Sequence, residues 1–115
     1  MNYVYMLITT RNHIYTGWTT DLNRRYREHL KLKTGAKYTR AFKPKSLAAA
    51  WRIESTRSDA MKIESGIKKL SRNEKEKLIQ EPQRLNEIFP EILPDEITYQ
   101  ILKVEELNHI ETSVS

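Results

Sequence analysis

The sequence predicts an α/β fold of the α+β type, in which a small three-stranded antiparallel sheet is flanked by helices and followed by a C-terminal extension. Three observations predict it. Two runs of β-branched and aromatic residues flank a short turn, two later segments carry apolar residues at helical spacing, and a capping box marks a third helix. A chain of 115 residues suits one domain with a modest core. We place this domain at residues 1–80 and a partly ordered acidic extension at residues 81–115.

The first predicted elements are a β-hairpin and a helix. Residues 3–9 (YVYMLIT) and 14–18 (IYTGW) are typical of strands, and the TRNH between them suits a turn. Thr20 or Asp21 can cap the helix that follows, which keeps a period of 3.6 residues until Gly35 ends it.

A loop, a strand and two helices complete the predicted domain. Residues 36–46 form a basic loop that contains Pro44, and residues 47–55 (LAAAWRIES) are predicted to be the third strand, although their alanines also suit a helix. Ser58 or Asp59 can cap a second helix. The SRNE that follows is a capping box, a serine with a glutamate three residues later, and it begins the last helix.

The composition excludes several classes of protein. The chain has no cysteine, which excludes disulfides, thiolate catalysis and a cysteine-ligated zinc site. It has no apolar run near the ~20 residues that cross a membrane, and its N-terminus lacks the basic-then-apolar order of a signal peptide. We therefore expect a soluble cytoplasmic protein with no membrane partner.

Charge is divided unevenly along the chain. Residues 1–80 hold 18 of the 20 Lys and Arg residues but 7 of the 15 acidic ones, a balance of +11, whereas residues 81–115 have a balance of −6. A basic surface often serves only solubility, but this excess favours a polyanionic partner, because each contact with a phosphate backbone releases counterions. The acidic extension is either simply solvated or folds over the basic face and competes with nucleic acid.

The first predicted helix has two basic residues on its apolar stripe. On a helical wheel, Arg25 and His29 fall on the same side as Leu22 and Tyr26. Arg24 and the other basic residues of this helix fall on the opposite side and face water. We therefore expect Arg25 and His29 to point towards the sheet.

The second predicted helix carries a carboxylate on its apolar face, where Glu64 falls on the stripe of Ile63 and Ile67. A buried carboxylate must be paired, neutralised or bound to a metal, since isolating it costs many kcal/mol. One interpretation is an internal ion pair with Arg25. The other is that Arg, His, Glu and the strand tyrosines converge on one polar site against the sheet.

Several short motifs resemble the GIY-YIG nuclease family, which is named for two tripeptides on a β-hairpin. In this chain the two tripeptides are YVY and YTG. Tyr5 ends the first and Tyr15 begins the second, ten residues later, and Arg25 in LNRR follows after another ten residues. AMKIESGIKKL contains the glutamate that holds the metal in the family. GAKYTR and IKKLSRNEK look like the small, stand-alone bacterial, UPF0213-like branch. The resemblance covers residues 2–80, and the matched positions are Tyr5, Tyr15, Arg25, His29 and Glu64.

Two positions depart from the family pattern. Tyr3 stands where the first tripeptide usually has glycine. Trp18 follows YTG where several relatives carry a lysine with an assigned catalytic role. The resemblance therefore does not carry the role of that lysine over to this chain.

The resemblance implies a metal-dependent endonuclease that hydrolyses phosphodiester bonds in nucleic acid, DNA more than RNA. Its five matched residues would form the catalytic site. Glu64 would hold Mg²⁺ (or Mn²⁺), for which one carboxylate suffices because Mg²⁺ keeps several waters. Arg25 would bind the phosphate, and Tyr15 would take or relay the proton of the attacking water. Tyr5 would position the water or phosphate, and His29 would orient Tyr5 or share the relay.

The basic loop is the candidate for contacts with the nucleic-acid backbone, although it could also be an ordinary solvated loop. Its candidate residues are Lys33, Lys37, Tyr38, Arg40, Lys43 and Lys45. Two alternatives stay open for the whole chain. It could be a nucleic-acid-binding module of the same fold with weak or no catalysis, or an interaction domain in which Arg25 and Glu64 form only a core ion pair. A protein partner that supplies targeting is compatible with any of these.

Overall fold

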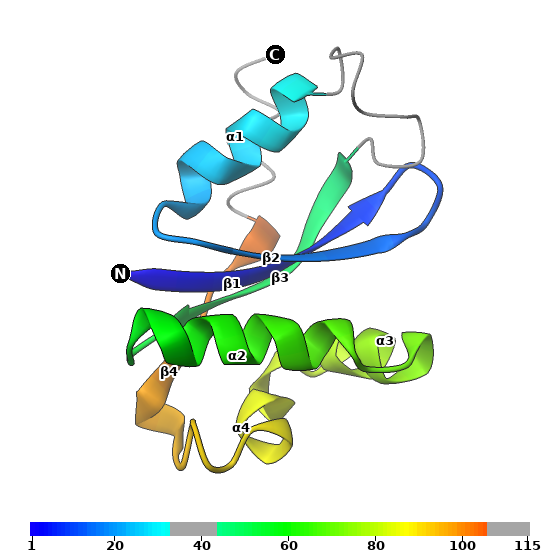
Figure 1. Cartoon of the computed structure of the whole chain (residues 1–115). Coiled ribbons are helices and arrows are strands. Elements are labelled where there is room, and N and C mark those ends of the chain that lie inside the picture. The colour runs from blue at the N-terminus through cyan, green and yellow to red at the C-terminus, as the bar shows by residue number, and fades with distance from the viewer. Residues whose placement is uncertain (33–43, 106–115) are drawn as a thin grey trace.

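The structure is a computed structural model that describes residues 1–32 and 44–105. Four antiparallel strands form one sheet in the order β2-β1-β3-β4. Helix α1 covers one face of this sheet, and helices α2, α3 and α4 cover the other (Figure 1). The α+β class predicted from the sequence is confirmed.

The three predicted strands are present. β1 (Asn2–Thr9) lies in the middle and pairs with both β2 (Ile14–Thr19) and β3 (Pro44–Ile53). The hairpin turn contains Asn12 at φ 62°, a conformation that asparagine tolerates better than most residues. β3 begins three residues earlier than predicted, at the proline that the sequence placed in the loop. A proline is tolerated at the first residue of a strand, because its missing N–H interrupts little of the ladder there.

The sheet has a fourth strand beyond the three predicted. β4 (Tyr99–Ile101) pairs with Trp51, Arg52 and Ile53 at the outer side of β3. Its three residues are too few to show an alternating pattern, and its pairing depends on a strand some fifty residues earlier in the chain. The sheet therefore has four strands instead of three.

The helices begin and end close to where the sequence predicts them. α1 spans Leu22–Leu32 and α2 spans Arg57–Lys68. The N-cap of α2 is Thr56, two or three residues before the predicted positions, and its hydroxyl accepts a hydrogen bond from the backbone N–H of Asp59.

The capping box predicted for the third helix is confirmed. α3 (Arg72–Gln80) begins after Ser71, whose hydroxyl accepts from the N–H of Glu74 while the Glu74 carboxylate accepts from the N–H of Ser71. No helix in the described parts of the chain is long and apolar enough to cross a membrane.

The C-terminal segment packs onto the same sheet up to β4. It comprises a 3₁₀ turn, η2 (Pro82–Arg84), the short helix α4 (Leu85–Ile88) and a second 3₁₀ turn, η3 (Glu96–Thr98). The division of the chain at residue 80 stays a prediction.

The sheet separates two apolar layers of unequal size. Because successive strand residues point to opposite faces, β1 contributes to both. The larger layer lies under α2, α3 and α4 and consists of Val4, Met6, Ala49, Trp51, Ile53, Ala60, Ile63, Ile67, Leu78, Leu85, Leu93 and Tyr99. The smaller layer lies under α1 and consists of Tyr5, Leu7, Leu22, Tyr26, Leu47 and Ala50.

Candidate active site

The hairpin register brings two tyrosines together under α1. Tyr5 of β1 lies opposite Gly17 of β2, and Leu7 lies opposite Tyr15, so that both phenols project from the same face. Their ring centroids are 6.3 Å apart. Gly17 makes this possible, because a β-carbon there would fall on the ring and phenol oxygen of Tyr5.

Helix α1 adds an arginine and a histidine to this pair. Both face the sheet, as the helical wheel predicts. Nε2 of His29 lies 2.9 Å from the phenol oxygen of Tyr5, and the imidazole packs edge-on against Tyr15 with 5.1 Å between centroids. The guanidinium of Arg25 is within hydrogen-bonding reach of both phenols. Four of the five residues matched to the family therefore form one cluster.

Burial sets the protonation states within the cluster. Tyr5 is 1% exposed and His29 6% exposed. Burial raises the pKa of the Tyr5 phenol above its ordinary value. Burial, assisted by the positive charge of Arg25, lowers the pKa of His29 to about 4. At neutral pH the imidazole is therefore uncharged and the phenol is protonated.

These states assign the direction of the hydrogen bonds. Arg25 has only donors, so its guanidinium donates to the phenol oxygen of Tyr5. The phenol hydrogen is then free to donate to Nε2 of His29, which leaves the ring proton on Nδ1. The side chain of Arg25 is 36% exposed and Tyr15 is half-buried. The cluster thus has an inner pair, Tyr5 and His29, and an outer pair, Tyr15 and Arg25.

The buried imidazole predicts an acid-sensitive fold. His29 binds a proton near pH 6.5 when the chain is unfolded but near pH 4 when it is folded. Acid therefore favours the unfolded chain, and we expect the contribution of His29 to stability to be fully present above pH 6.5 and lost by pH 4, a loss of about 3 kcal/mol. Urea unfolding of wild type and His29→Gln across this range measures it. Parallel stability curves for the two proteins would contradict the assignment.

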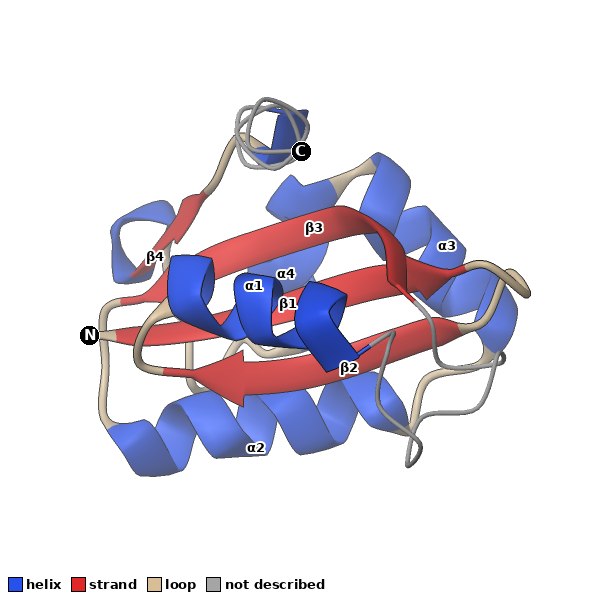
Figure 2. Cartoon of the chain, turned by 90° about the horizontal axis from the view of Figure 1, so that it is seen from above, coloured by secondary structure: helices blue, strands red, loops and turns tan. Residues whose placement is uncertain are grey.

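The fifth matched residue lies on the other side of the sheet. Glu64 belongs to α2, which packs against β2 and β1 opposite α1 (Figure 2). Its side chain is 21% exposed, and its carboxylate lies 3.6 Å from Nζ of Lys68. The ion pair between Arg25 and Glu64 that the sequence left open is therefore wrong.

The partner of Arg25 is a residue that the sequence interpretation missed. Nη1 of Arg25 donates to Oε2 of Glu28 at 3.1 Å. The spacing of three residues on one helix was a signal for this pair. Glu28 also lies 3.5 Å from Arg24. Glu28 is therefore the ion-pair partner of the Arg25 guanidinium, whose other neighbours are the phenols of Tyr5 and Tyr15.

Among the described strands, the two parts of the site lie on opposite faces of the strand at the edge of the sheet. β2 is the edge strand, Tyr15 projects from one of its faces, and α2 runs along the other. Tyr15 and Arg25 therefore lie on one side of this strand, and the helix that carries Glu64 lies on the other. Such an arrangement differs from the single cavity that the sequence suggested.

Trp18 lies on the α2 side of β2, where it packs against the larger apolar layer. The guanidinium carbon of Arg57, at the start of α2, lies 4.7 Å from the centroid of the Trp18 ring. A cation is therefore stacked on the residue that stands in place of the family's lysine.

Most of the predicted nucleic-acid-binding residues lie outside the described part of the chain. These are Lys33, Lys37, Tyr38, Arg40 and Lys43. Lys45 lies in β3, but its side chain is not among those described.

Comparisons with known proteins agree with the motifs. A family model described as the GIY-YIG catalytic domain matches residues 1–77. The UPF0213 protein of Syntrophus aciditrophicus is 44% identical over 85 residues, which cover 73% of this chain and 97% of that protein. A UPF0213 protein of Bacillus velezensis is 41% identical over 95 residues, which cover 83% of this chain and 94% of that protein.

One solved structure is similar as well, the solution NMR structure of a UPF0213 protein from Bacillus halodurans. It has 42% sequence identity and a TM-score of 0.46, and the match covers 75% of this chain and 94% of that chain. The matched motifs and the family model together show that the chain belongs to the GIY-YIG family, whose domain indicates a nuclease-type function and a nucleic-acid substrate.

Proposed function

We propose that the chain is a metal-dependent endonuclease that hydrolyses phosphodiester bonds, in DNA more than in RNA. The observation that carries this proposal is the convergence of Tyr5, Tyr15, Arg25 and His29 under α1, with two of them open to solvent. The basic balance of residues 1–80 supports a polyanionic substrate.

Arg25 binds the scissile phosphate in this proposal. Its guanidinium is planar and can form two parallel hydrogen bonds to phosphate oxygens. The exposed part of this guanidinium now pairs with Glu28, and a phosphate could take the place of the Glu28 carboxylate. Because the Tyr5 phenol raises the pKa of Arg25 further, its positive charge is permanent and stabilises the negative charge that builds up in the transition state.

The tyrosines and the histidine have distinct tasks. Tyr15, half-buried beside Arg25, takes or relays the proton of the attacking water. Tyr5, at 1% exposure, cannot touch the phosphate from its present position. It is a positioning residue, which holds Arg25 by accepting a hydrogen bond and holds His29 by donating one.

Glu64 would hold the divalent metal that GIY-YIG nucleases generally use. Its partly exposed carboxylate offers the oxygen ligands that Mg²⁺ and Mn²⁺ prefer, and the ion would replace the Lys68 ammonium as its partner. Three or more His, Asp or Glu residues do not cluster anywhere in the described chain, which is compatible with an ion that keeps most of its waters. When bound, the ion supplies Lewis-acid stabilisation of the leaving oxygen.

One observation favours a second candidate, a nucleic-acid-binding module with weak or no catalysis. Glu64 and Arg25 lie on opposite faces of the sheet and have separate ion-pair partners. The third interpretation, an interaction domain with a core ion pair between these residues, loses the contact on which it depended.

The cleavage assay with Glu64→Gln tests the proposal. We expect the full chain to nick supercoiled plasmid with Mg²⁺ or Mn²⁺, chelation to stop it, and the variant to cleave about 100-fold more slowly. The amide keeps the size of the side chain but lacks the charge that attracts a cation. The measurement is the initial rate over a titration of each metal.

Glu76→Gln is the matched control, since Glu76, like Glu64, pairs with a basic residue four positions away on its own helix, while its side chain is more exposed. It is expected to cleave as wild type does. Nucleic-acid binding without cleavage in wild type would favour the second candidate. Equal cleavage by Glu64→Gln and wild type would reject Glu64 as the metal ligand. We also propose that the protein acts in the cytoplasm and that a protein partner could supply its targeting.

A further inference from the structure

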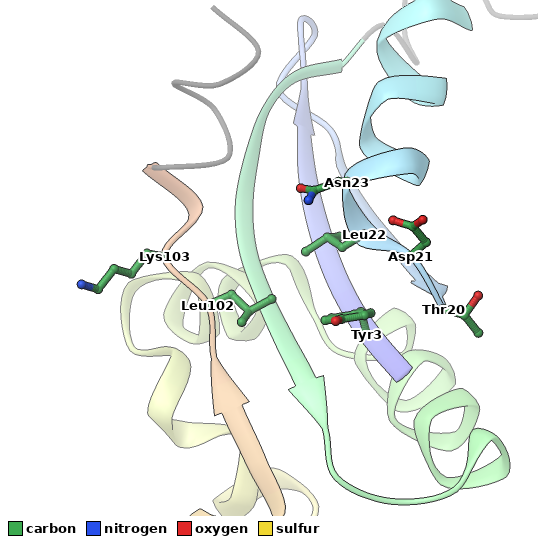
Figure 3. Close-up of a pocket in the computed structure, with 7 residues that line it drawn as sticks. All are labelled: Tyr3, Thr20, Asp21, Leu22, Asn23, Leu102 and Lys103. Carbon is green, nitrogen blue, oxygen red and sulfur yellow. The ribbon is translucent and has the colours of Figure 1, made fainter. Parts of the chain in front are cut away.

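A pocket of about 410 Å³ lies beside the cluster, on the same face of the sheet. Figure 3 shows its walls: Tyr3 of β1 forms the floor, Leu22 at the start of α1 lies above it, and Leu102, just after β4, closes one side. Asp21 and Asn23 stand at the rim beside Leu22. Three segments far apart in the sequence therefore build one pocket.

The lining combines a flat aromatic surface with apolar walls and a polar rim. The Tyr3 ring is only partly buried and packs with Leu102 at the margin of the smaller apolar layer. Asn23 is exposed and carries an amide, which offers both a hydrogen-bond donor and an acceptor. The Asp21 carboxylate caps α1 by accepting from the N–H of Arg24 at 3.1 Å. Thr20 and Lys103 complete the lining, so its polar part includes both a carboxylate and an ammonium. A planar heterocycle with polar edges fits the aromatic floor and this polar part better than a purely aliphatic group does.

The pocket adjoins the residues proposed to act on the phosphate. Tyr3 precedes Tyr5 by two residues and shares its face, which corresponds to about 7 Å along the strand. Leu22 and Arg25 are three residues apart on α1, so their side chains lie on neighbouring turns of one face. A nucleotide whose base enters the pocket would hold its own phosphodiester group near Arg25, whose guanidinium reaches on towards Tyr15.

We propose that this pocket binds an unpaired nucleobase next to the scissile phosphate. The substrate would then be a nucleic acid with a single-stranded or unpaired nucleotide at the cleavage point, since a base stacked inside a duplex cannot enter. This inference rests on the proposed function and names its substrate class. The base would stack on Tyr3 between Leu22 and Leu102, and the Asn23 amide would meet its polar edge.

Two parts of the pocket differ from what defines the family. Tyr3 occupies the position of the glycine in the first tripeptide, where a family member with glycine has no ring to offer. Leu102 lies beyond residue 77, where the family match ends. The preference for an unpaired base would therefore be set by residues outside the matched catalytic positions.

A fluorescence assay tests the pocket independently of cleavage. The full-length Glu64→Gln protein is titrated into a duplex that carries one unpaired 2-aminopurine, in the presence of Mg²⁺. We expect the fluorescence of the base to be quenched on binding, with about tenfold higher affinity than for the fully paired duplex. Replacing the unpaired nucleotide by an abasic one should remove the preference without any change to the protein.

Paired variants identify the residue responsible. Tyr3→Leu keeps apolar bulk without a stacking surface and should lose the quenching and the tenfold preference, whereas Tyr3→Phe should keep both. Ile97→Ala removes an exposed apolar side chain away from the pocket, 83% exposed, and should behave as the parent does. Thermal unfolding of each variant shows that the fold is retained.

The outcomes separate this inference from the proposed function. Base-dependent binding by a wild-type chain that never cleaves would support the pocket and reject the nuclease. Cleavage and binding that ignore both the abasic replacement and Tyr3→Leu would overturn the pocket and leave the nuclease standing. Equal affinity for free adenosine monophosphate and for the strand would also overturn it, because the pocket would then serve a mononucleotide.

Discussion

Arg25→Ala is expected to lower the rate of phosphodiester cleavage about 1000-fold. The variant loses a guanidinium that is within hydrogen-bonding reach of both phenols and has an exposed side, and with it the fixed positive charge next to the reacting phosphate. Arg25→Lys should recover only part of the rate, because an ammonium keeps the charge but cannot form two parallel hydrogen bonds. Single-turnover cleavage at saturating protein measures the loss apart from any weakening of binding.

The same helix supplies the control for this prediction. Arg24 and Arg27 flank the cluster in sequence but are exposed on the outer face of α1. Arg24→Ala and Arg27→Ala remove the same charge and should stay within about threefold of the wild-type single-turnover rate. If either variant lost as much of the single-turnover rate as Arg25→Ala, the total charge of the helix would explain the effect, and the assignment of Arg25 to the phosphate would be rejected.

Gly17→Ala is expected to damage both stability and cleavage. The new methyl group would fall on the ring and phenol oxygen of Tyr5, which is 1% exposed and has no free space to enter. We expect a loss of about 2–3 kcal/mol in the free energy of unfolding, or roughly 10 °C in Tm. Because Tyr5 positions Arg25 and His29, cleavage by the folded protein should fall at least about 100-fold.

Gly66→Ala is the control for Gly17→Ala, because it creates a similar steric clash on the other face of the sheet. A β-carbon on Gly66 would fall on the ring of Phe89, which packs against the larger apolar layer on the other face of the sheet. We expect a similar loss of stability, measured by thermal unfolding, but a wild-type cleavage rate per folded molecule. Equal losses of cleavage in the two variants would show that general destabilisation, and not the position of Tyr5, explains the effect.

The parts of the structure that the sequence predicted are those set by local signals. Alternation in β1, the period of α1 and the capping box at Ser71 each depend on residues a few positions apart, and the structure agrees with all three. β4 was missed because three residues carry no period, and only its contact with β3 makes it a strand. The sequence does not predict the early start of β3, because a proline is typical of loops and is tolerated only at the first residue of a strand.

In the candidate site too, the features set by local sequence are predicted and those set by long-range packing are not. The helical wheel correctly predicts that Arg25 and His29 face the sheet, because the side of a helix on which a residue lies depends on that helix alone. A wheel cannot say which face of the sheet a helix covers, and for this reason an inward Arg25 and an inward Glu64 looked like partners. The three-residue spacing of Arg25 and Glu28 is compatible with their ion pair, but the same spacing is common on exposed helix faces and does not single this pair out.

The indole of Trp51 has a consequence for anyone who shortens this protein. Its N–H donates to the carbonyl oxygen of Pro82 at 2.9 Å, and the residue itself is 0% exposed at the middle of the sheet. A fragment trimmed to the family match would leave that donor without an acceptor and would uncover the ring, which costs several kcal/mol by the usual values for buried polar groups and aromatic packing. The segment that matches the family is therefore not an independent folding unit, because Pro82 and β4 complete the hydrogen bonding of β3.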